Sequence, residues 1–312
     1  MNVTLADVLL ARERLRAAFP PSPLVRLDVE GDAEIWLKLE NLHPIGSFKL
    51  RGAGNALLAA PPEQLREGAV TASAGNMAQG VAWWARRLGV PATAIVPERA
   101  PAAKTLAVER LGGRVQRVPF DHWWAIMDGS EPPGVPGCFI HPVADPSVIA
   151  GNGTLGLELI EALPRIDTVL VPWGGGGLSS GIATALRDLR PEARVYGCEV
   201  ETSTPLTASL AAGRPMTVEH QPSFVDGIGG KSLLPVMWPL AERLIAGSVV
   251  VTLDQVRQAV RLLVARHRVV AEGAGAVSVA AALADHARSV TVCVVSGGNI
   301  QADVLAEVLA GR

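Results

Sequence analysis

The sequence predicts an α/β fold with a mostly parallel sheet, and three observations lead to this prediction. Short apolar runs rich in β-branched residues alternate with helix-length amphipathic runs along the chain. Of the 312 residues, 49% are hydrophobic and only 19% are charged, so the chain can bury one large core or two moderate ones. Glycine-rich loops follow several apolar runs, and the loops beyond the carboxyl ends of parallel strands are where ligands bind.

The predicted strands and helices follow one another along the whole chain. It opens with an amphipathic helix capped by Thr4, because charged residues interrupt the apolar stretch that a signal peptide needs. Strands are predicted over residues 34–39, 69–72, 92–96, 114–118, 138–140, 168–171, 194–198 and 290–295. The segments between them predict helices, including one that ends at Leu88 before Gly89 and one over residues 180–189.

Charge and cysteine content restrict the possible partners and the location. Lys and Arg number 28 and Asp and Glu number 30, and no block of like charge indicates nucleic-acid or membrane binding. The longest uncharged stretch, residues 168–186, contains Pro172 and four successive glycines, which disfavours a membrane helix. Three widely spaced cysteines without metal-ligand spacing suit reduced thiols. We therefore expect a cytoplasmic protein whose partners are small molecules.

Lysine is scarce, which draws attention to each one. The chain has lysine only at Lys38, Lys49, Lys104 and Lys231. Lys49 lies in PIGSFKLRG, a turn that enters a helix directly after the first predicted strand. Burial at such an entrance lowers the pKa of a lysine, which makes its amine a competent imine-forming nucleophile. Considered alone, the segment also allows a solvated lysine at a helix start.

Three further loops follow predicted strands. In SAGNMAQG, a helix N-terminus offers free N–H groups to a carboxylate, and Ser73 and Asn76 add side-chain hydrogen bonds, although a plain helix cap is the alternative. Four glycines, Gly174 to Gly177, precede Leu178 at another helix start, where backbone amides can cradle a phosphate. The last loop, SGGN, places the Ser296 hydroxyl after the final predicted strand.

A dinucleotide-binding fold is a competing interpretation of the four glycines. Glu199 ends the next predicted strand, where an acidic contact to a ribose would lie. The dinucleotide fingerprint needs glycines at its first, third and sixth positions, whereas counting from Gly174 gives Gly174, Gly176 and Ser179. The spacing therefore argues against an NAD-dependent dehydrogenase.

In this order, GSFKLRG, SAGNMAQG, GGGGL and SGGN resemble the fold-type II pyridoxal-phosphate enzymes, specifically the group of threonine/serine dehydratases (ammonia-lyases) and serine racemases. The similarity spans nearly the whole chain and includes HPVADPSVIAGNGT, residues 141–154, and AEGAGAV, residues 271–277. It implies two domains, each with a mostly parallel twisted sheet flanked by helices. The large cofactor-binding domain would comprise residues 1–67 and 145–312, and a small mobile domain, residues 68–144, would carry the substrate-carboxylate loop.

The resemblance also implies a role for each loop. Lys49 would carry pyridoxal 5'-phosphate as a Schiff base and act as the catalytic base, with Phe48 beside the ring, Asn76 at its phenolic oxygen and Ser296 at its nitrogen. The phosphate would be bound by Gly174, Gly175, Gly176, Gly177 and the Leu178 amide. The substrate would be bound by Ser73, Ala74, Gly75, Asn76 and Met77. The implied reaction is β-elimination from a β-hydroxy L-amino acid, above all L-threonine or L-serine, to a 2-oxo acid and ammonia.

Departures from the family pattern bear on the substrate. Racemases have a second serine where this chain has Ala74, and alanine cannot exchange a proton, so serine racemisation is disfavoured. Met77 replaces a histidine, and Trp173 replaces a small aliphatic residue. These changes indicate either a pocket for a bulkier or acidic β-hydroxy amino acid, such as phenylserine or 3-hydroxyaspartate, or ordinary packing. The other tryptophans considered for such a pocket are Trp83, Trp84, Trp123 and Trp124.

The acidic residues and the assembly complete the expectations. Glu199 matches the first ligand of a divalent-ion site in some relatives, but Pro205 stands where another carboxylate is expected, so we expect a weak metal site or none. Glu272 is either an acid near the cofactor or a surface helix cap, and Asp226 is expected to be structural. We expect a homo-oligomer, a dimer. A non-catalytic pyridoxal-phosphate-binding protein is a competing class, and the four polar site residues at positions 49, 73, 76 and 296 argue against it.

Overall fold

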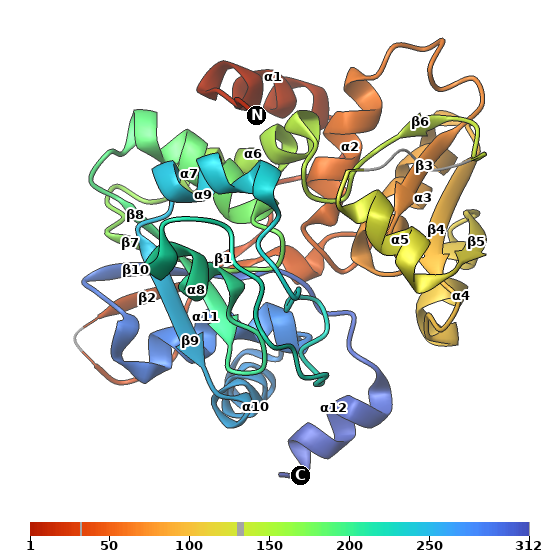
Figure 1. The fold of residues 1–312 in the computed structure, drawn as a ribbon. Coiled ribbons are helices and arrows are strands. Elements are labelled where there is room, and N and C mark those ends of the chain that lie inside the picture. The colour runs from red at the N-terminus through yellow and green to blue at the C-terminus, as the bar shows by residue number, and fades with distance from the viewer. Residues whose placement is uncertain (32, 130–133, 312) are drawn as a thin grey trace.

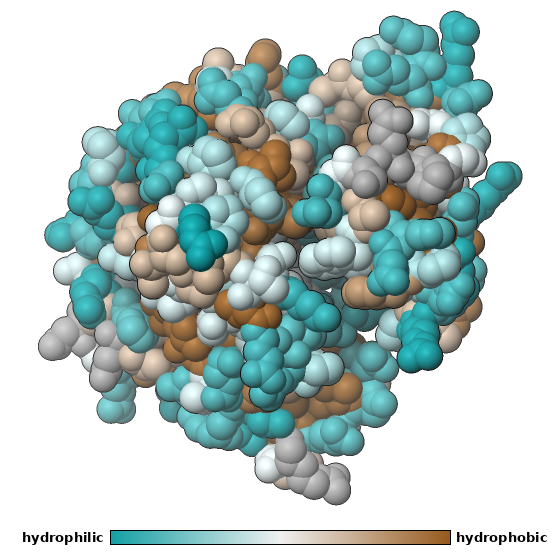
Figure 2. Space-filling model, in the orientation of Figure 1, coloured by the Kyte–Doolittle hydropathy of each residue, from teal (hydrophilic) through white to brown (hydrophobic). Residues whose placement is uncertain are grey.

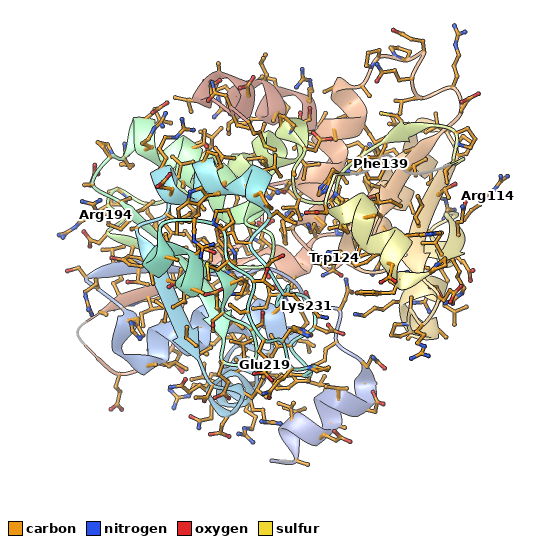
Figure 3. All side chains as sticks on the ribbon, viewed as in Figure 1. Arg114, Trp124, Phe139, Arg194, Glu219 and Lys231 are labelled. Carbon is orange, nitrogen blue, oxygen red and sulfur yellow. The ribbon has the colours of Figure 1, made fainter. Side chains whose placement is uncertain are left out.

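The structure, a computed structural model, describes residues 1–31, 33–129 and 134–311. Two sheets organise this part of the chain, and helices flank both of them (Figure 1). The larger sheet lies on the left of the view and the smaller sheet on the right (Figure 1). Arg194 projects from the left end of the molecule and Arg114 from the right end (Figure 3). The predicted α/β class with mostly parallel strands is confirmed.

The larger sheet has six strands, of which only the first, at one edge, is antiparallel to its neighbour. In spatial order they are β1 (Leu24–Arg26), β2 (Glu34–Leu39), β10 (Val290–Val295), β7 (Thr168–Pro172), β8 (Arg194–Val200) and β9 (Gly247–Val251). Helices cover both faces of this sheet. Successive residues of a strand point to opposite sides, so each strand contributes side chains to both cores. In β10, Val292 and Val294 pack in a core with helices α6 and α7, whereas Cys293 and Val295 pack in another with α10 and α11.

The helices of the larger part lie on these two faces and at the rim of the sheet (Figure 1). One group comprises α1 (Leu5–Leu15), α6 (Pro146–Ala162), α7 (Gly177–Leu189) and α9 (Trp238–Leu244). The others are α8 (Pro205–Ala212), α10 (Leu253–Leu262), α11 (Gly273–Ala281) and α12 (Ala302–Leu309). Short 3-10 helices span Glu40–Leu42 and Pro235–Met237, and π-helical turns span Leu263–His267 and Ala282–His286.

The smaller sheet has four parallel strands and its own apolar cores. In spatial order they are β5 (Arg114–Val118), β4 (Ala92–Pro97), β3 (Ala69–Ala72) and β6 (Cys138–Phe139). Its helices are α3 (Asn76–Leu88), α4 (Ala102–Arg110) and α5 (Phe120–Met127), and α2 (Lys49–Ala59) packs between α3 and α6 of the larger part. All four strands lie within residues 68–144, of which 130–133 are outside the described part. The domain boundaries and the mobility of this unit remain a proposal.

Most predicted elements occur where the sequence placed them, and the exceptions have local causes. Thr4 caps α1 by accepting a hydrogen bond from the Asp7 amide. Strands β1 and β9 were not predicted, and helix α7 begins at Gly177 rather than at residue 180. Gly176 has φ +88°, a left-handed conformation that turns the chain directly into the helix. No helix of the described residues is both long and apolar enough to span a bilayer.

Candidate active site

A cavity of about 940 Å³ lies between the two parts of the molecule, where the space-filling view shows a hollow in the surface (Figure 2). Loops that follow β3, β7 and β10 line it, together with the start of α2 and faces of α4 and α5. Every residue that the sequence assigned to the cofactor or the substrate lines this one cavity. They are Phe48, Lys49, Ser73, Ala74, Gly75, Asn76, Met77, Gly174, Gly175, Gly176, Gly177, Leu178, Glu272 and Ser296.

Lys49 is the first residue of α2, and its amine lies in the cavity. The Phe48 amide donates a hydrogen bond to the Ser296 carbonyl over 3.0 Å, which joins the start of α2 to the loop after β10. The Lys49 Nζ donates to the Pro142 carbonyl over 2.8 Å and lies 5.1 Å from the centre of the Phe48 ring. Burial lowers the pKa of Lys49 to about 8. This environment disagrees with the alternative of a solvated surface lysine.

A buried group of charged residues fixes α2 immediately behind Lys49. Arg51 is 1% exposed and donates to both oxygens of Glu40, over 2.7 and 2.9 Å, and to both oxygens of Glu158, over 2.6 and 2.8 Å. Lys38 also donates to Glu158. Burial acts to raise the pKa of Glu40, but the Arg51 guanidinium holds it well below its usual value. The helix that carries Lys49 is therefore held by bidentate ion pairs.

The loop before α3 presents backbone and side-chain groups to the cavity. Gly75 is the N-cap residue and no side chain caps the helix, which excludes the plain side-chain cap considered above. The Ser73 hydroxyl accepts a hydrogen bond from the Gly75 amide over 3.2 Å. Asn76 donates to Glu272 over 2.9 Å and accepts from Asn299 over 2.8 Å. Asn76 thus joins α3 to two loops of the larger part.

Two residues of the four-glycine loop, Gly175 and Gly176, need to be glycine because their neighbours leave no room for a side chain. A Cβ at Gly175 would lie 2.5 Å from the Val143 side chain, and a Cβ at Gly176 would lie 2.5 Å from the Trp173 ring. Trp173 is 2% exposed; it packs against Gly176 of the loop and does not line the cavity. The loop leads into the N-terminus of α7 at Gly177, where free amides are available to an anion.

Glu272 is buried beside Asn76 rather than exposed at a helix end. It is 8% exposed, and although it is the N-cap residue of α11 it makes no capping hydrogen bond, so the surface-cap alternative is wrong. Burial, helped by the Asp226 carboxylate, raises its pKa to about 7, although the hydrogen bond from Asn76 opposes the rise. Asp226 itself lines the cavity and pairs with Lys104 of α4 over 2.7 Å.

Glu199 lies away from the cavity, and its carboxylate is occupied. Its oxygens accept hydrogen bonds from the Leu206 amide and from the amide and hydroxyl of Thr207, over 2.6 to 2.8 Å, at the start of α8. Within residues 1–31, 33–129 and 134–311, no group of three or more His, Cys, Asp or Glu side chains is arranged to hold a metal ion.

The tryptophans divide between packing and the cavity. Trp83 and Trp84 pack edge to face in the core of the smaller part, with ring centres 5.1 Å apart. Trp124 lies near the line where the two parts face each other and stacks on Phe120 (Figure 3). Of the five tryptophans that the sequence singled out, Trp123 is the one that lines the cavity. Packing is therefore the correct interpretation for Trp83, Trp84 and Trp173.

Sequence reasoning missed several cavity residues. His141, Pro142 and Val143 connect the smaller sheet to α6, and Pro142 and Val143 line the cavity beside Lys49. The HP pair of the 141–154 segment was the available signal, but Pro142 contributes a backbone carbonyl, which no side-chain pattern reveals. Lys104 and Asn299 reach the cavity through contacts with residues more than 100 positions away.

The chain is similar to a known protein family, to characterised sequences and to solved structures. The model of the pyridoxal-phosphate-dependent enzyme family matches residues 15–297. The L-threonine ammonia-lyase of Thermotoga maritima is 39% identical over 315 residues, covering 98% of this chain and 78% of that protein. The structure of the T.th. threonine deaminase has a TM-score of 0.84 at 32% identity, covering 96% of this chain and 99% of that one. The structure of maize serine racemase has a TM-score of 0.90 at 29% identity, covering 100% and 98%.

Proposed function

Because the chain belongs to the family of pyridoxal-phosphate-dependent enzymes, we propose that it is a threonine/serine ammonia-lyase that uses Lys49. L-Threonine would give 2-oxobutanoate and ammonia, and L-serine would give pyruvate and ammonia. One observation carries the proposal: the Lys49 amine, with its lowered pKa, lines the same cavity as the four-glycine loop and the loop before α3. An amine nucleophile, an anion cradle and a carboxylate site are the three groups that this reaction needs.

The residues around the cavity fit pyridoxal phosphate. Lys49 supplies an amine for its aldehyde, Gly174 to Gly177 supply amides for its phosphate, and Ser296 supplies a neutral hydroxyl for its ring nitrogen. Asn76 has a second amide hydrogen beyond the one that it donates to Glu272, which suits the phenolic oxygen. When bound, the cofactor holds the substrate amino group and withdraws electrons from Cα.

The chain's own residues then have distinct tasks. The amides at the start of α3, with Ser73, would hold the substrate carboxylate and so orient Cα toward Lys49. The freed Lys49 amine would remove the Cα proton, because a pKa of about 8 leaves part of the amine unprotonated near neutral pH. The β-hydroxyl would then take up a proton and leave as water, so that the Cα proton and the hydroxyl are lost together as one water molecule. A second water hydrolyses the released enamine, after its tautomerisation to the imine, to the 2-oxo acid and ammonia.

Racemisation is less well supported than elimination. The maize serine racemase has a similar fold, but a racemase needs a proton donor on the opposite side of Cα from the lysine. Ala74 stands on the cavity wall where the racemase pattern has its serine, and a methyl group carries no transferable proton. We expect racemisation of L-serine to be far slower than its deamination.

A second candidate substrate is a β-hydroxy amino acid with an aromatic β-substituent. Phe120, Trp123 and Met127 of α5 all line the cavity, and the Phe120 and Trp123 ring centres lie 6.0 Å apart. Phe120 is 53% exposed, so one face of this aromatic group is free to contact a ligand. Arg99 and Arg110 also line the cavity, and they keep 3-hydroxyaspartate among the substrates to be tested.

The test is a 2-oxo acid assay across L-threonine, L-serine, phenylserine and 3-hydroxyaspartate, paired with borohydride reduction of the loaded enzyme. We expect L-threonine and L-serine to give 2-oxo acids, and the reduced cofactor to be found on the Lys49 peptide. Lys49→Ala should lose both signals, whereas the control Lys231→Ala, at an exposed site, should retain them. Label on another lysine, or turnover by Lys49→Ala at the wild-type rate, would refute the proposal.

We also propose that the enzyme works as a homodimer in the cytoplasm. Leu10 and Leu42, which are 55% and 56% exposed, are candidates for the contact between the subunits. Sedimentation velocity of the loaded enzyme tests the dimer, and a species of 32.6 kDa at micromolar concentration would contradict it.

A further inference from the structure

The turn that follows the smaller sheet lies against both Lys49 and the four-glycine loop. After β6 the chain passes through residues 141–144 and enters α6 at Pro146. The Pro142 carbonyl accepts the hydrogen bond from the Lys49 amine over 2.8 Å, the one hydrogen bond that this amine makes within the described part of the chain. The next residue, Val143, packs against Gly175. This turn therefore determines where the Lys49 amine finds an acceptor.

One side chain, His141, holds the turn through both of its ring nitrogens. Its Nδ1 accepts hydrogen bonds from the amides of Val143, over 3.1 Å, and Ala144, over 2.8 Å. Backbone amides can only donate, so Nδ1 carries no proton, and Nε2–H donates to the Met127 carbonyl at the end of α5 over 3.1 Å. His141 thus ties the turn beside Lys49 to a helix of the smaller part.

The surroundings keep this arrangement in its neutral form. Burial lowers the pKa of His141, the nearby Lys49 lowers it further, and the Met127 carbonyl and the Asp145 carboxylate oppose the shift without reversing it. The charged groups on the cavity wall, apart from Lys49, are Arg99, Lys104, Arg110, Asp226 and Glu272. A protonated imidazole would have to break its two bonds from the turn amides, because Nδ1 would become a donor.

We propose that His141 is a positioning residue for Lys49: it holds the 142–144 turn so that the Pro142 carbonyl receives the Lys49 amine whenever that amine is free of the cofactor. A fixed acceptor on one side of Nζ leaves its lone pair directed elsewhere, toward the proton to be taken. After the proton is taken, the same carbonyl binds the ammonium more strongly than the amine. Proline suits this position because its ring fixes φ, one of the two backbone rotations on which the direction of the carbonyl depends.

This inference rests on the proposed function, in which Lys49 is the acting amine, and two substitutions separate the two sides of the imidazole. His141→Asn retains an acceptor near the Nδ1 position and loses the bond to Met127. His141→Gln places its polar atoms nearer the Nε2 position and loses the bonds from Val143 and Ala144. His141→Ala removes both. The matched control is His122→Gln, at an exposed position on α5.

Two measurements test the proposal. The first is the pH dependence of the rate at which the cofactor-free protein captures pyridoxal phosphate, followed by visible absorbance, which reports the pKa of the Lys49 amine. The second is kcat and KM for L-threonine. We expect His141→Gln and His141→Ala to lower kcat roughly 10- to 100-fold, the cost of about 1 Å of misplacement, with KM changed by less than about threefold. The pKa of Lys49 should fall by about half to one unit in these variants, because the ammonium loses its acceptor.

The result that supports the proposal differs from the results that would contradict it. His141→Asn should retain kcat within about threefold and the wild-type pKa of Lys49, since it keeps the bonds to the turn. If His141→Asn lost as much kcat as His141→Ala with the pKa of Lys49 unchanged in both, or if all variants matched the wild type, the proposal would be wrong. If the wild type neither captured the cofactor through Lys49 nor deaminated threonine, the proposed function would fail first, and with it the premise of this test. A melting curve for each variant identifies any that does not fold, and the comparison of Asn with Gln decides without His141→Ala.

Discussion

Two cavity residues, Lys49 and Glu272, have pKa values displaced toward neutrality from opposite directions. Burial penalises the charged form of each, so the pKa of the lysine falls to about 8 and the pKa of the carboxyl group rises to about 7. Both groups therefore change charge near the pH at which the enzyme would work. Such pairs are typical of acid–base sites, whereas ion pairs that only support a fold are displaced away from neutrality, as Glu40 is beside Arg51.

The buried Glu272 should make stability fall as pH rises. Its pKa in the folded protein, about 7, exceeds the value of 4.5 expected without burial, so the folded state binds the proton more tightly in between. The contribution of Glu272 to the unfolding free energy is therefore fully present below about pH 4.5 and is lost as the pH rises to about 7. Glu272→Gln removes this titratable group and with it this part of the pH dependence. From pH 5 to pH 8 the unfolding free energy of the variant should improve relative to the wild type by ~1–3 kcal/mol.

Urea unfolding of both cofactor-free proteins at a series of pH values measures this difference. The matched control is Glu242→Gln, because Glu242 is exposed on α9. Its difference from the wild type should not vary with pH in the same way. Parallel curves for the wild type and Glu272→Gln would show that the carboxyl group is not perturbed.

At the scale of elements, hydrophobic patterning predicted the buried central strands and missed the two edge strands of the larger sheet. All five positions of β7 are buried, and such a continuous apolar run is easily recognised. Strand β1 has only three residues, and in β9 only Val249 and Val251 are buried, so neither carries a strong pattern. The start of α7 was misplaced because the left-handed Gly176 lets the helix begin inside the glycine run, where composition alone indicates a loop.

Helix α2 should depend on its buried ion pairs far more than a surface helix depends on its own. Arg51→Met leaves Glu40 and Glu158 without their main partner inside the protein, and we expect a loss of ~3–5 kcal/mol in unfolding free energy. The matched control is Arg12→Met. Arg12 also lies 2.6 Å from a glutamate, Glu161, but the two side chains are 39% and 61% exposed, so its loss should cost less than ~1 kcal/mol.

Guanidinium unfolding at neutral pH compares the two variants directly. The buried pair should also affect the site, because Lys49 lies two residues before Arg51 on the same helix. Equal losses for Arg51→Met and Arg12→Met would mean that burial does not distinguish the two pairs.

At the scale of the whole molecule, the sequence identified those parts of the site that follow strands. Ser73, Gly174 and Ser296 belong to loops at the ends of β3, β7 and β10, and Lys49 begins the helix that follows β2; parallel topology brings these segments together. The contacts between the two parts could not be predicted, because they join residues far apart in sequence and depend on how the two sheets pack. The pair of Lys104 and Asp226 spans 122 positions.

That ion pair is a link between α4 of the smaller part and the segment before α9 of the larger one, at the edge of the cavity. If the smaller part closes over the substrate, as proposed for residues 68–144, the pair should favour the closed state. Lys104→Asp places two carboxylates opposite each other and should raise KM for L-threonine about fivefold, the factor that corresponds to ~1 kcal/mol for an exposed pair. Stability of the cofactor-free protein should change little, because both side chains are partly exposed.

The exchanged double variant, Lys104→Asp with Asp226→Lys, separates the pair from its single residues. Restoring opposite charges should return KM to within about twofold of the wild type, since residues in contact are coupled. Raising the salt concentration should reduce the difference between Lys104→Asp and the wild type, because exposed charges are screened. A double variant as impaired as Lys104→Asp would mean that Lys104 acts on the substrate or on Glu272 rather than through Asp226, since its charge also acts to lower the pKa of Glu272.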